Sequence, residues 1–180
     1  FAWENDKVAH RTYGSALAAP AAGTGKEVLV SSGLDVWAKR VNYLVVDRWY
    51  NKGHDHYHKD EGEGMDLYQV GPSRGCGGTG IWDGSRLWVS GNYTHWQVIA
   101  NGPIRAIFEL SYNTWMAGGV MVSEVKRFTV DAGHNLDEIE STFAVTGAKE
   151  VTIGIGLNKA PADRDQDAEV VLGTSAADGS

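Results

Sequence analysis

The chain has 180 residues, of which 42% are hydrophobic and 22% charged, a composition that fits one globular domain and excludes a disordered or collagen-like chain. Its 16 basic and 23 acidic residues give a formal net charge of −7, and because no Lys/Arg-rich run occurs either, we expect no nucleic-acid partner. No apolar stretch approaches the roughly 20 residues of a membrane helix, so we expect no membrane insertion.

Glycine and tryptophan are both in excess. The 23 glycines exceed the roughly 7% that is usual and favour tight turns and bulges. The seven tryptophans have two interpretations, which are packing inside the core and stacking of an indole on the apolar face of a sugar ring. The single cysteine, Cys76, cannot form an internal disulfide, so it gives no signal for or against an oxidising compartment.

The first half of the chain gives few clear elements. The apolar residues of 34–41 are spaced for one or two helical turns, and residues 43–46 form an apolar run that predicts a buried strand. Residues 51–80 are polar and rich in histidine and glycine. Long segments of this kind in compact domains are functional or disordered, so we predict a functional loop here.

The second half is dominated by strand signals. Asp83-Gly84 between apolar flanks predicts a hairpin over residues 81–88 with a type I′ turn, in which both central residues have positive φ. Alternation of apolar and polar residues, and the turn signals around it, predict further strands over residues 104–112, 120–130, 139–145 and 151–157, with turns at 101–103 and 117–119.

The order of these elements predicts the fold class. Many short strands without a helix between each pair indicate an all-β, antiparallel sandwich or barrel. Residues 160–180 are rich in Ala and Asp, and we predict that they form a surface connection. Residues 1–6 are neither an initiator methionine nor a signal-peptide pattern, so we interpret residues 1–180 as a fragment of one domain cut from a longer chain, outside which any targeting signal would lie. We therefore expect an incomplete sandwich with unpaired strand edges that favour aggregation.

Three histidines form the densest cluster of chemistry-bearing residues. His54, His56 and His58 occupy alternate positions, so on a strand they would project from one face and suit a divalent metal. Two other interpretations stay open. The histidines can lie in a solvated loop, or His58 can perform acid/base chemistry with Tyr57 and without a cofactor, by removing the proton next to the carboxylate of a uronate sugar.

The same segment carries carboxylates and a glycine run. Paired acids such as Glu63 and Asp66 suit glycoside hydrolysis if they lie roughly 5 to 10 Å apart, although a solvated acidic loop is the plainer interpretation. Residues 71–80 superficially resemble a phosphate-binding loop but lack its Gly-Lys-Ser/Thr ending. Within that run, Cys76 is interpreted as a small packed residue in preference to a nucleophile.

Arginines and an aromatic pair complete the candidate set. Four arginines are candidates for a clamp on the carboxylate of an acidic sugar, namely Arg40, Arg48, Arg74 and Arg105. Trp96, next to His95, can stack on a sugar ring. Arg105 lies on the polar face of a predicted strand, where it can equally be a solvent-exposed residue.

Several sequence blocks in a fixed order resemble one family. These blocks are FAWEND (1–6), YG (13–14), GLDVW (33–37), DRWY (47–50), YH (57–58), GEGMD (62–66), VGPS (70–73), GCGG (75–78), ANGPIR (100–105) and SEVKR (123–127). Together they are similar to the bacterial domain of unknown function 4861, over nearly the whole chain. The order of many blocks is more specific than any single motif.

The resemblance implies a β-supersandwich related to mutarotase-like and polysaccharide-lyase domains, in exported bacterial proteins of polysaccharide degradation that are periplasmic or extracellular. It implies uronate-containing oligosaccharides as substrates and a lyase or dehydratase reaction. We expect that this reaction requires no cofactor. The residues that the resemblance carries into a sugar site are Tyr57, His58, Glu63, Asp66, Ser73 and Arg74. Among these, we expect His58 in a concave site with Tyr57 or a carboxylate within hydrogen-bond reach. The alternative function is a non-catalytic sugar-binding module.

Overall fold

The computed structural model describes residues 1–20 and 28–158, and the backbone of residues 169–177. The elements in chain order are β1 (Ala2–Glu4), β2 (Val8–Arg11), α1 (Ser15–Ala18), β3 (Asp35–Lys39), α2 (Val46–Lys52), α3 (His54–Tyr57), β4 (Gly64–Asp66), β5 (Cys76–Trp82), β6 (Leu87–Trp88), β7 (His95–Asn101), β8 (Arg105–Ala117), β9 (Val120–Asp131), β10 (Glu138–Thr146), β11 (Glu150–Asn158) and β12 (Glu169–Ala177).

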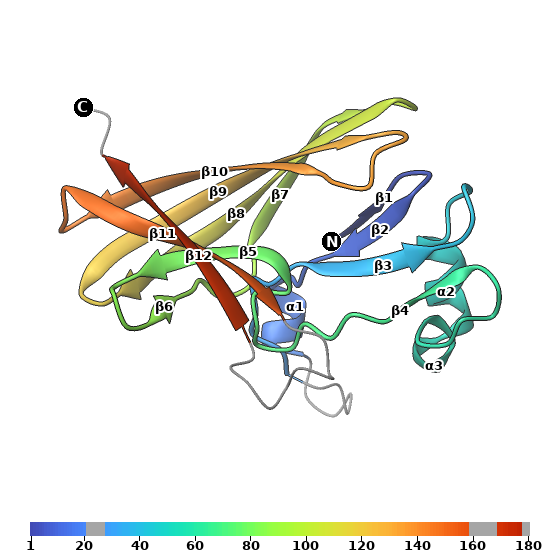
Figure 1. The fold of residues 1–180 in the computed structure, drawn as a ribbon, viewed down its shortest axis with the longest axis horizontal. Helices are drawn as coiled ribbons and strands as arrows, with labels where there is room; N and C mark the ends of the chain where they lie inside the picture. The colour runs from blue at the N-terminus through green and yellow to red at the C-terminus, as the bar shows by residue number, and fades with distance from the viewer. Residues whose placement is uncertain (21–27, 159–168, 178–180) are drawn as a thin grey trace.

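The strands form three antiparallel sheets. The N-terminal sheet has the order β1-β2-β3-β4, the long sheet β10-β9-β8-β7, and the β11 sheet β12-β11-β5-β6. The long sheet makes one layer, and the other two sheets lie side by side across from it (Figure 1). The prediction of an all-β antiparallel sandwich is confirmed.

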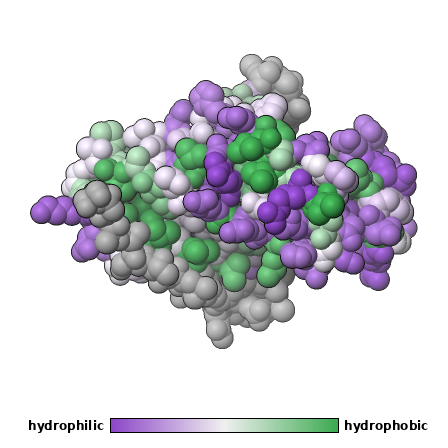
Figure 2. Space-filling model, turned by 90° about the horizontal axis from the view of Figure 1, so that it is seen from above, coloured by the Kyte–Doolittle hydropathy of each residue, from purple (hydrophilic) through white to green (hydrophobic). Residues whose placement is uncertain are grey.

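Alternation explains why the long strands were predictable. On β9, every second residue from Val122 to Val130 is buried, and the residues that alternate with them are more exposed. One half of the long sheet packs against the N-terminal sheet around Phe108 and Phe128, and the other half packs against the β11 sheet around residues such as Val122. Seen from above, apolar residues gather over the sheets, whereas the end that carries α2 and α3 is mostly hydrophilic (Figure 2).

A charged cluster is buried between the two layers. Glu124 and Lys126 of β9 point inward, at 2% and 1% exposure. The Lys126 ammonium contacts Glu124 and Thr79 of β5, and it donates to Ser141 Oγ of β10 over 3.2 Å. Thr79 in turn donates to Glu124 Oε1 over 2.7 Å. Because Thr79 belongs to the β11 sheet, this cluster joins the two layers.

The N-terminal sheet has two different faces. In register with one another, Trp3, His10 and Val36 share one face, and Trp3 packs with Phe108 and Phe128 of the long sheet. The opposite face carries Ala9 and Trp37, which α2 and α3 cover with the aromatic rings of Trp49 and Tyr57. Arg11, Asp35 and Asp66 follow the same alternation and lie on this second face.

Two expectations for residues 34–46 are corrected. Residues 35–39 form strand β3 in place of helical turns, and residues 43–46 do not form a buried strand. Tyr43 and Leu44 are exposed, and α2 starts at Val46. The reason is Glu4, whose carboxylate accepts the backbone N–H groups of Val45 and Val46 over 2.8–3.0 Å and so occupies the donors that a strand would need.

The turn predictions are confirmed with one correction. Residues 76–88 form a hairpin, but no non-glycine residue in the described chain has positive φ, so the turn is not type I′. Asp83 Oδ1 instead accepts the N–H groups of Ser85 and Arg86, which closes a longer loop. Between β8 and β9, Gly118 and Gly119 have φ of 58° and 96°, the positive values that a two-residue hairpin turn needs.

The remaining strand predictions match β8, β9, β10 and β11. Residues 51–80 are not one continuous loop, since they include the end of α2, helix α3, strand β4 and the start of β5. Within the predicted surface connection over residues 160–180, residues 169–177 form β12 against β11. Residues 160–168 and 178–180 of that prediction lie outside the described residues.

Candidate functional site

A cleft of about 770 Å³ opens on the second face of the N-terminal sheet. Its walls come from β2, from α3 and its C-terminal residue, and from the segment that follows β4. The lining residues are Arg11, Tyr13, Leu29, His54, His58, Met65, Asp66, Leu67, Tyr68, Gln69, Val70 and Gly71. Polar and aromatic side chains therefore line one cleft.

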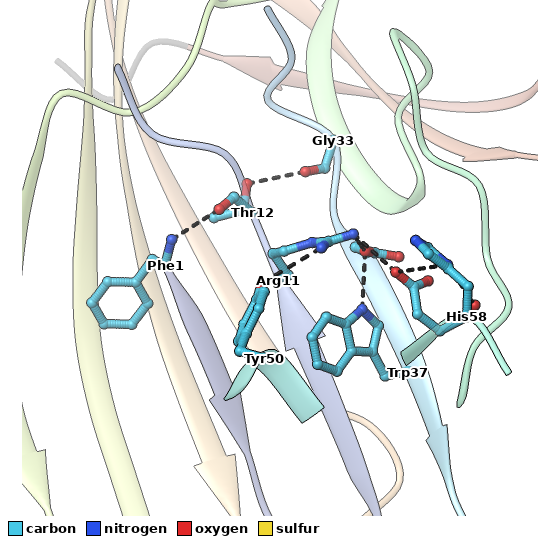
Figure 3. A network of polar contacts seen from close by, with 9 residues as sticks. Phe1, Arg11, Thr12, Gly33, Trp37, Tyr50 and His58 are labelled. Atoms are coloured by element: carbon cyan, nitrogen blue, oxygen red, sulfur yellow. Dashed lines mark hydrogen bonds and ion pairs between the residues drawn. The ribbon is translucent and has the colours of Figure 1, made fainter. Parts of the chain in front are cut away.

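Arg11 lies at the floor of the cleft between two carboxylates. Its Nη2 donates to Asp35 Oδ2 over 2.5 Å and to Asp66 Oδ2 over 3.0 Å. Asp35 has no exposed surface and Asp66 is 4% exposed. Figure 3 shows the guanidinium of Arg11 at the centre of the network, with Trp37 and His58 directed toward the same group of carboxylates.

Aromatic rings surround this charged group. The guanidinium carbon of Arg11 lies 5.2 Å from the ring centroid of Trp37 and 5.4 Å from that of Tyr13, distances at which a cation is attracted to an aromatic face. Trp37 Nε1 also donates to Asp35 Oδ2 over 3.1 Å. Tyr57 stacks on Trp37 with ring centroids 5.2 Å apart. These ring contacts hold the guanidinium of Arg11 at the floor of the cleft.

Burial makes the two carboxylates weaker acids. It raises the pKa of Asp35 to about 6, against the opposing effect of Arg11. It also raises the pKa of Asp66, again against Arg11. Burial, together with the charge of Asp35, raises the pKa of Tyr13 well above its usual value, so this hydroxyl keeps its proton.

His58 connects the buried group to the open cleft. Its side chain is 40% exposed, and its Nδ1 lies 3.2 Å from the carbonyl oxygen of Asp66 and 3.7 Å from Asp66 Oδ2. Both oxygens are acceptors, so in the neutral imidazole the geometry assigns the ring proton to Nδ1 and the lone pair to Nε2. The ring of His54 lies 4.6 Å from that of His58 at the same cleft.

Two predicted site residues, His58 and Asp66, therefore meet in the cleft, and His54 joins them. The expected carboxylate lies beside His58 at ion-pair distance, while the hydrogen bond goes to the backbone carbonyl of the same residue. Tyr57 lies behind them, 7% exposed and stacked in the core. It touches His58 by its ring, at 4.6 Å between centroids, and is not part of the cleft wall.

The three histidines do not share one face. Residues 54–57 are helical, and residues two apart on a helix point to nearly opposite sides. His56 accordingly turns away and pairs with Glu61, with 3.1 Å between Nδ1 and Oε2. Among the residues that the structure describes, no group of three His, Cys, Asp or Glu side chains is arranged to hold a metal. The side chains present do not fit a three-histidine site.

Glu63 is bound to protein groups and lies outside the cleft. Its carboxylate accepts from Tyr43 and Arg48 over 2.6 Å each and from Trp49 Nε1 over 3.0 Å. These hydrogen bonds, that of Tyr43 first, lower the pKa of Glu63 to about 2. The side chain holds α2 beside β4, and Arg48 is thereby occupied as well. Arg40 likewise pairs with Asp60, at 2.7 Å.

Ser73 and Arg74 are also outside the cleft wall. Ser73 Oγ donates to the carbonyl of Val70 over 2.6 Å and accepts the N–H of Gly75, which shapes the turn before β5. Arg74 is 2% exposed and donates to Ser32 Oγ over 2.7 Å. The structure therefore places the carried-over arginine in the interior and not at the candidate ligand site.

Trp96 and Arg105 lie on the long sheet, away from the cleft lining. Trp96 on β7 is 61% exposed, although in register it shares the inner face with buried Leu110. Arg105 at the start of β8 makes two hydrogen bonds with Asp131, at 2.6 and 2.7 Å. Cys76 packs against the core, and burial raises the pKa of its thiol to about 12, which argues against a nucleophile.

Arg11, Asp35 and Tyr13 were missed by sequence reasoning. One signal was present, since Asp35 interrupts an apolar run between Leu34 and Trp37, and a buried acid needs a partner. Its partner Arg11 is 24 residues away and becomes a neighbour only through the β2–β3 pairing. No local pattern contains both residues.

The fold and cleft define an all-β sandwich domain with an arginine–dicarboxylate group at the floor of an open cleft. Residues 1–178 match the family described as domain of unknown function (DUF4861), and the chain belongs to this family. It is 38% identical over 161 residues to "Uncharacterized protein P7" of Formosa agariphila, a match that covers 88% of this chain and 40% of the relative. The chain thus spans less than half the length of that relative.

No solved structure matches the chain. Among the described residues, helices long and apolar enough to cross a membrane are absent.

Proposed function

We propose that this chain carries the ligand cleft of a carbohydrate-active protein that acts on uronate-containing oligosaccharides by elimination, as a lyase or dehydratase. The substrate class rests on the family resemblance, and the reaction rests on the geometry around His58. The same proposal includes the finer assignment of the sandwich to the β-supersandwich group, an acidic oligosaccharide as partner, and a periplasmic or extracellular location in bacterial polysaccharide degradation.

The observation that carries the proposal is the position of His58. Its Nδ1 faces two oxygens of Asp66, so Nε2 keeps a lone pair beside a cleft large enough for sugar residues. A base at this place can take the proton from C5 of a uronate, the carbon next to the carboxylate. The electron pair of that C–H bond forms the C4–C5 double bond, and the C4–O bond breaks.

The leaving oxygen and the substrate carboxylate also need partners. Tyr13 lines the cleft, and its raised pKa keeps a proton available for the leaving oxygen. His54, at the cleft wall, is the candidate partner for the substrate carboxylate, because Arg11 already pairs with Asp35 and Asp66. Tyr13 replaces Tyr57 as the candidate acid, since the latter is not part of the cleft wall.

His58→Ala tests the proposal. We expect turnover to fall by roughly 100- to 10,000-fold with little change in substrate binding and an intact fold. The assay is ultraviolet absorbance of the new double bond, which is conjugated to the carboxylate. His56→Ala is the matched control, because His56 lies in helix α3, two residues before His58, but outside the cleft lining. Full activity of His58→Ala would contradict the proposal, and a chelator that reproduces its effect would indicate a metal-dependent role instead.

A non-catalytic sugar-binding module is the second candidate, and the exposure of Trp96 favours it. Such a module would retain acidic oligosaccharides on an affinity column, leave them unchanged, and lose retention in Trp96→Ala. Hydrolysis by Glu63 and Asp66 has less support, because three protein donors already occupy the Glu63 carboxylate. It would produce new reducing ends without a change in absorbance.

A further inference from the structure

We propose that Arg11 and Asp35 are positioning residues that hold Asp66 in the place from which it fixes the proton on His58. This inference rests on the proposed function, in which His58 Nε2 is the base. Neither residue contacts His58 by a hydrogen bond or ion pair in the described structure. Their role follows from how Asp66 is held and from what Asp66 does to the imidazole.

Asp66 is weakly held by the sheet itself. It is the last residue of β4, which has three residues and is the edge strand of the N-terminal sheet. The strand β3 pairs with it on one side only, and the ladder ends at Trp37 opposite Asp66. Ends of short edge strands fray, so the backbone carbonyl that faces His58 needs another anchor. The ion pair with Arg11 supplies one, in addition to the hydrogen bond that the Asp66 carboxylate accepts from the backbone N–H of Tyr68.

Arg11 reaches this position because Asp35 holds it. Arg11 belongs to β2, and Asp35 of β3 lies between β2 and β4. One nitrogen, Nη2, serves both carboxylates, at 2.5 Å and 3.0 Å. Arg11 Nε and Asp35 Oδ1 are both buried, and within the described residues neither has a hydrogen-bond partner. Arg11 and Asp35 therefore form one hydrogen bond where a bidentate arginine–carboxylate pair would form two. The same guanidinium nitrogen also binds Asp66, so Arg11 is shared between the two carboxylates.

The position of the Asp66 carboxylate beside His58 depends on Arg11 being shared between Asp35 and Asp66. The groups that face it are Asp66 from β4, Arg11 from β2 with Asp35 behind it, and His54 and Tyr57 from α3. Removal of the Asp35 charge leaves Arg11 to pair with Asp66 alone. We expect the carboxylate then to turn from His58 toward Arg11, and the preference for a proton on Nδ1 to weaken.

The first measurement needs no substrate. In ¹⁵N NMR spectra at neutral pH, the wild-type chain should show His58 mainly as the Nδ1–H tautomer. Asp35→Asn, which keeps the side-chain shape, should give a mixed tautomer population, and so should Arg11→Lys, which keeps the charge but loses the fork. The control is Glu109→Gln, which removes an arginine partner on the long sheet, where Arg127 donates to Glu109 over 2.6 and 2.9 Å. It should leave the His58 signals unchanged.

The second measurement uses turnover. Asp35→Asn should lower kcat by roughly 10- to 100-fold, comparable to loss of an outer-shell partner in metal sites, with KM unchanged. In a His58→Ala background the same change should cost nothing more, because the effect passes through His58. A purely structural role would lower stability and add to the His58→Ala loss.

The two proposals fail in different ways. If the chain eliminates nothing from uronates but the NMR result holds, the proposed function fails and the positioning role stands. An unchanged tautomer in folded Asp35→Asn and Arg11→Lys overturns the positioning role. Failure of both variants to fold also overturns it, because the pair would then be a requirement of the fold.

Discussion

Loss of the Lys126 ammonium should be among the costliest single changes in the chain. Lys126→Met keeps the length and apolar stem of the side chain but removes every polar contact of the ammonium group. Glu124, at 2% exposure, is then left with the hydroxyl of Thr79 as its hydrogen-bond donor in the described structure. The carboxylate becomes a buried charge without its cation.

The magnitude follows from that burial. Removing one partner of a buried ion pair costs about 3–5 kcal/mol. Burial lowers the pKa of Lys126 against the opposing charge of Glu124, and the nearby charge of Arg74 lowers it further. Because the Arg74 charge also offsets part of the Glu124 charge, we expect a cost near the lower end, about 3 kcal/mol. In the double variant Lys126→Met/Glu124→Gln no uncompensated charge remains, and we expect it to recover about 2 kcal/mol of that cost.

Equilibrium urea unfolding measures this effect. With a slope of about 2 kcal/mol per M, Lys126→Met should lower the midpoint by about 1.5 M. Arg127→Met is the matched control, because Arg127 is the next residue on β9 but faces solvent and pairs with Glu109 at the surface. Its effect should be far smaller. Equal midpoint shifts for the two variants, or no recovery in the double variant, would refute the reasoning.

Three further predictions concern single side chains. Glu63→Gln should destabilise the chain above pH 4.5; since folding lowers the Glu63 pKa to about 2, the gap to wild type should shrink as pH falls from 4.5 toward 2 in urea titrations. Gly75→Ala should lower the free energy of unfolding by at least about 2 kcal/mol in thermal unfolding, because the new Cβ would lie 1.9 Å from the Leu34 carbonyl oxygen at a φ of +62°. Gly84→Ala is the control, because Gly84 also has a positive φ but its Cβ would have no atom within 4 Å, so its loss of stability should be clearly smaller. Equal losses of stability in the two variants would contradict the steric clash at Gly75. Glu4→Gln should lower the free energy of unfolding by about 3 kcal/mol in urea titrations, because the Lys39 ammonium, which has no exposed side-chain surface, loses its ion pair with the Glu4 carboxylate at 2.9 Å. Asp47→Asn is the control, because Asp47 is exposed and its effect on stability should be much smaller. A similar unfolding midpoint for the two variants would argue against a stabilising role of the buried pair.

The strands that could be predicted are those with one buried and one open face. The strands β8, β9 and β11 have nine or more residues, and apolar residues recur at every second position over part of each, as in Phe108, Leu110 and Tyr112 of β8. The strands β1 to β4 have three to five residues, and β2 buries both Val8 and Ala9 because each face of its sheet is covered. Strands this short contain too few residues for an apolar–polar alternation to be recognised in the sequence, so the sequence did not reveal the sheet that builds the cleft.

The candidate site was predictable only in part for a related reason. His58 and Asp66 stand in a polar segment, where their residue types suggest chemistry. The residue types of Glu63 and Arg74 suggested a ligand site equally well, but in the structure their side chains bind other protein side chains, such as Trp49 and Ser32. Those partners lie 14 and 42 residues away in sequence, and only the folded chain brings them together.

The alternation of the N-terminal sheet also determines which kinds of sequence change it tolerates. Core-facing Trp3 and His10 stand directly beside residues of the cleft face, so adjacent positions in β2 belong to opposite sides of the sheet. A substitution alters one side chain, but deletion of a single residue within β2 would exchange the two faces and direct His10 toward the cleft floor and Arg11 into the aromatic core. Insertions and deletions in natural relatives should therefore fall in the connections of this sheet and not within its strands, even where the substitutions between relatives are numerous.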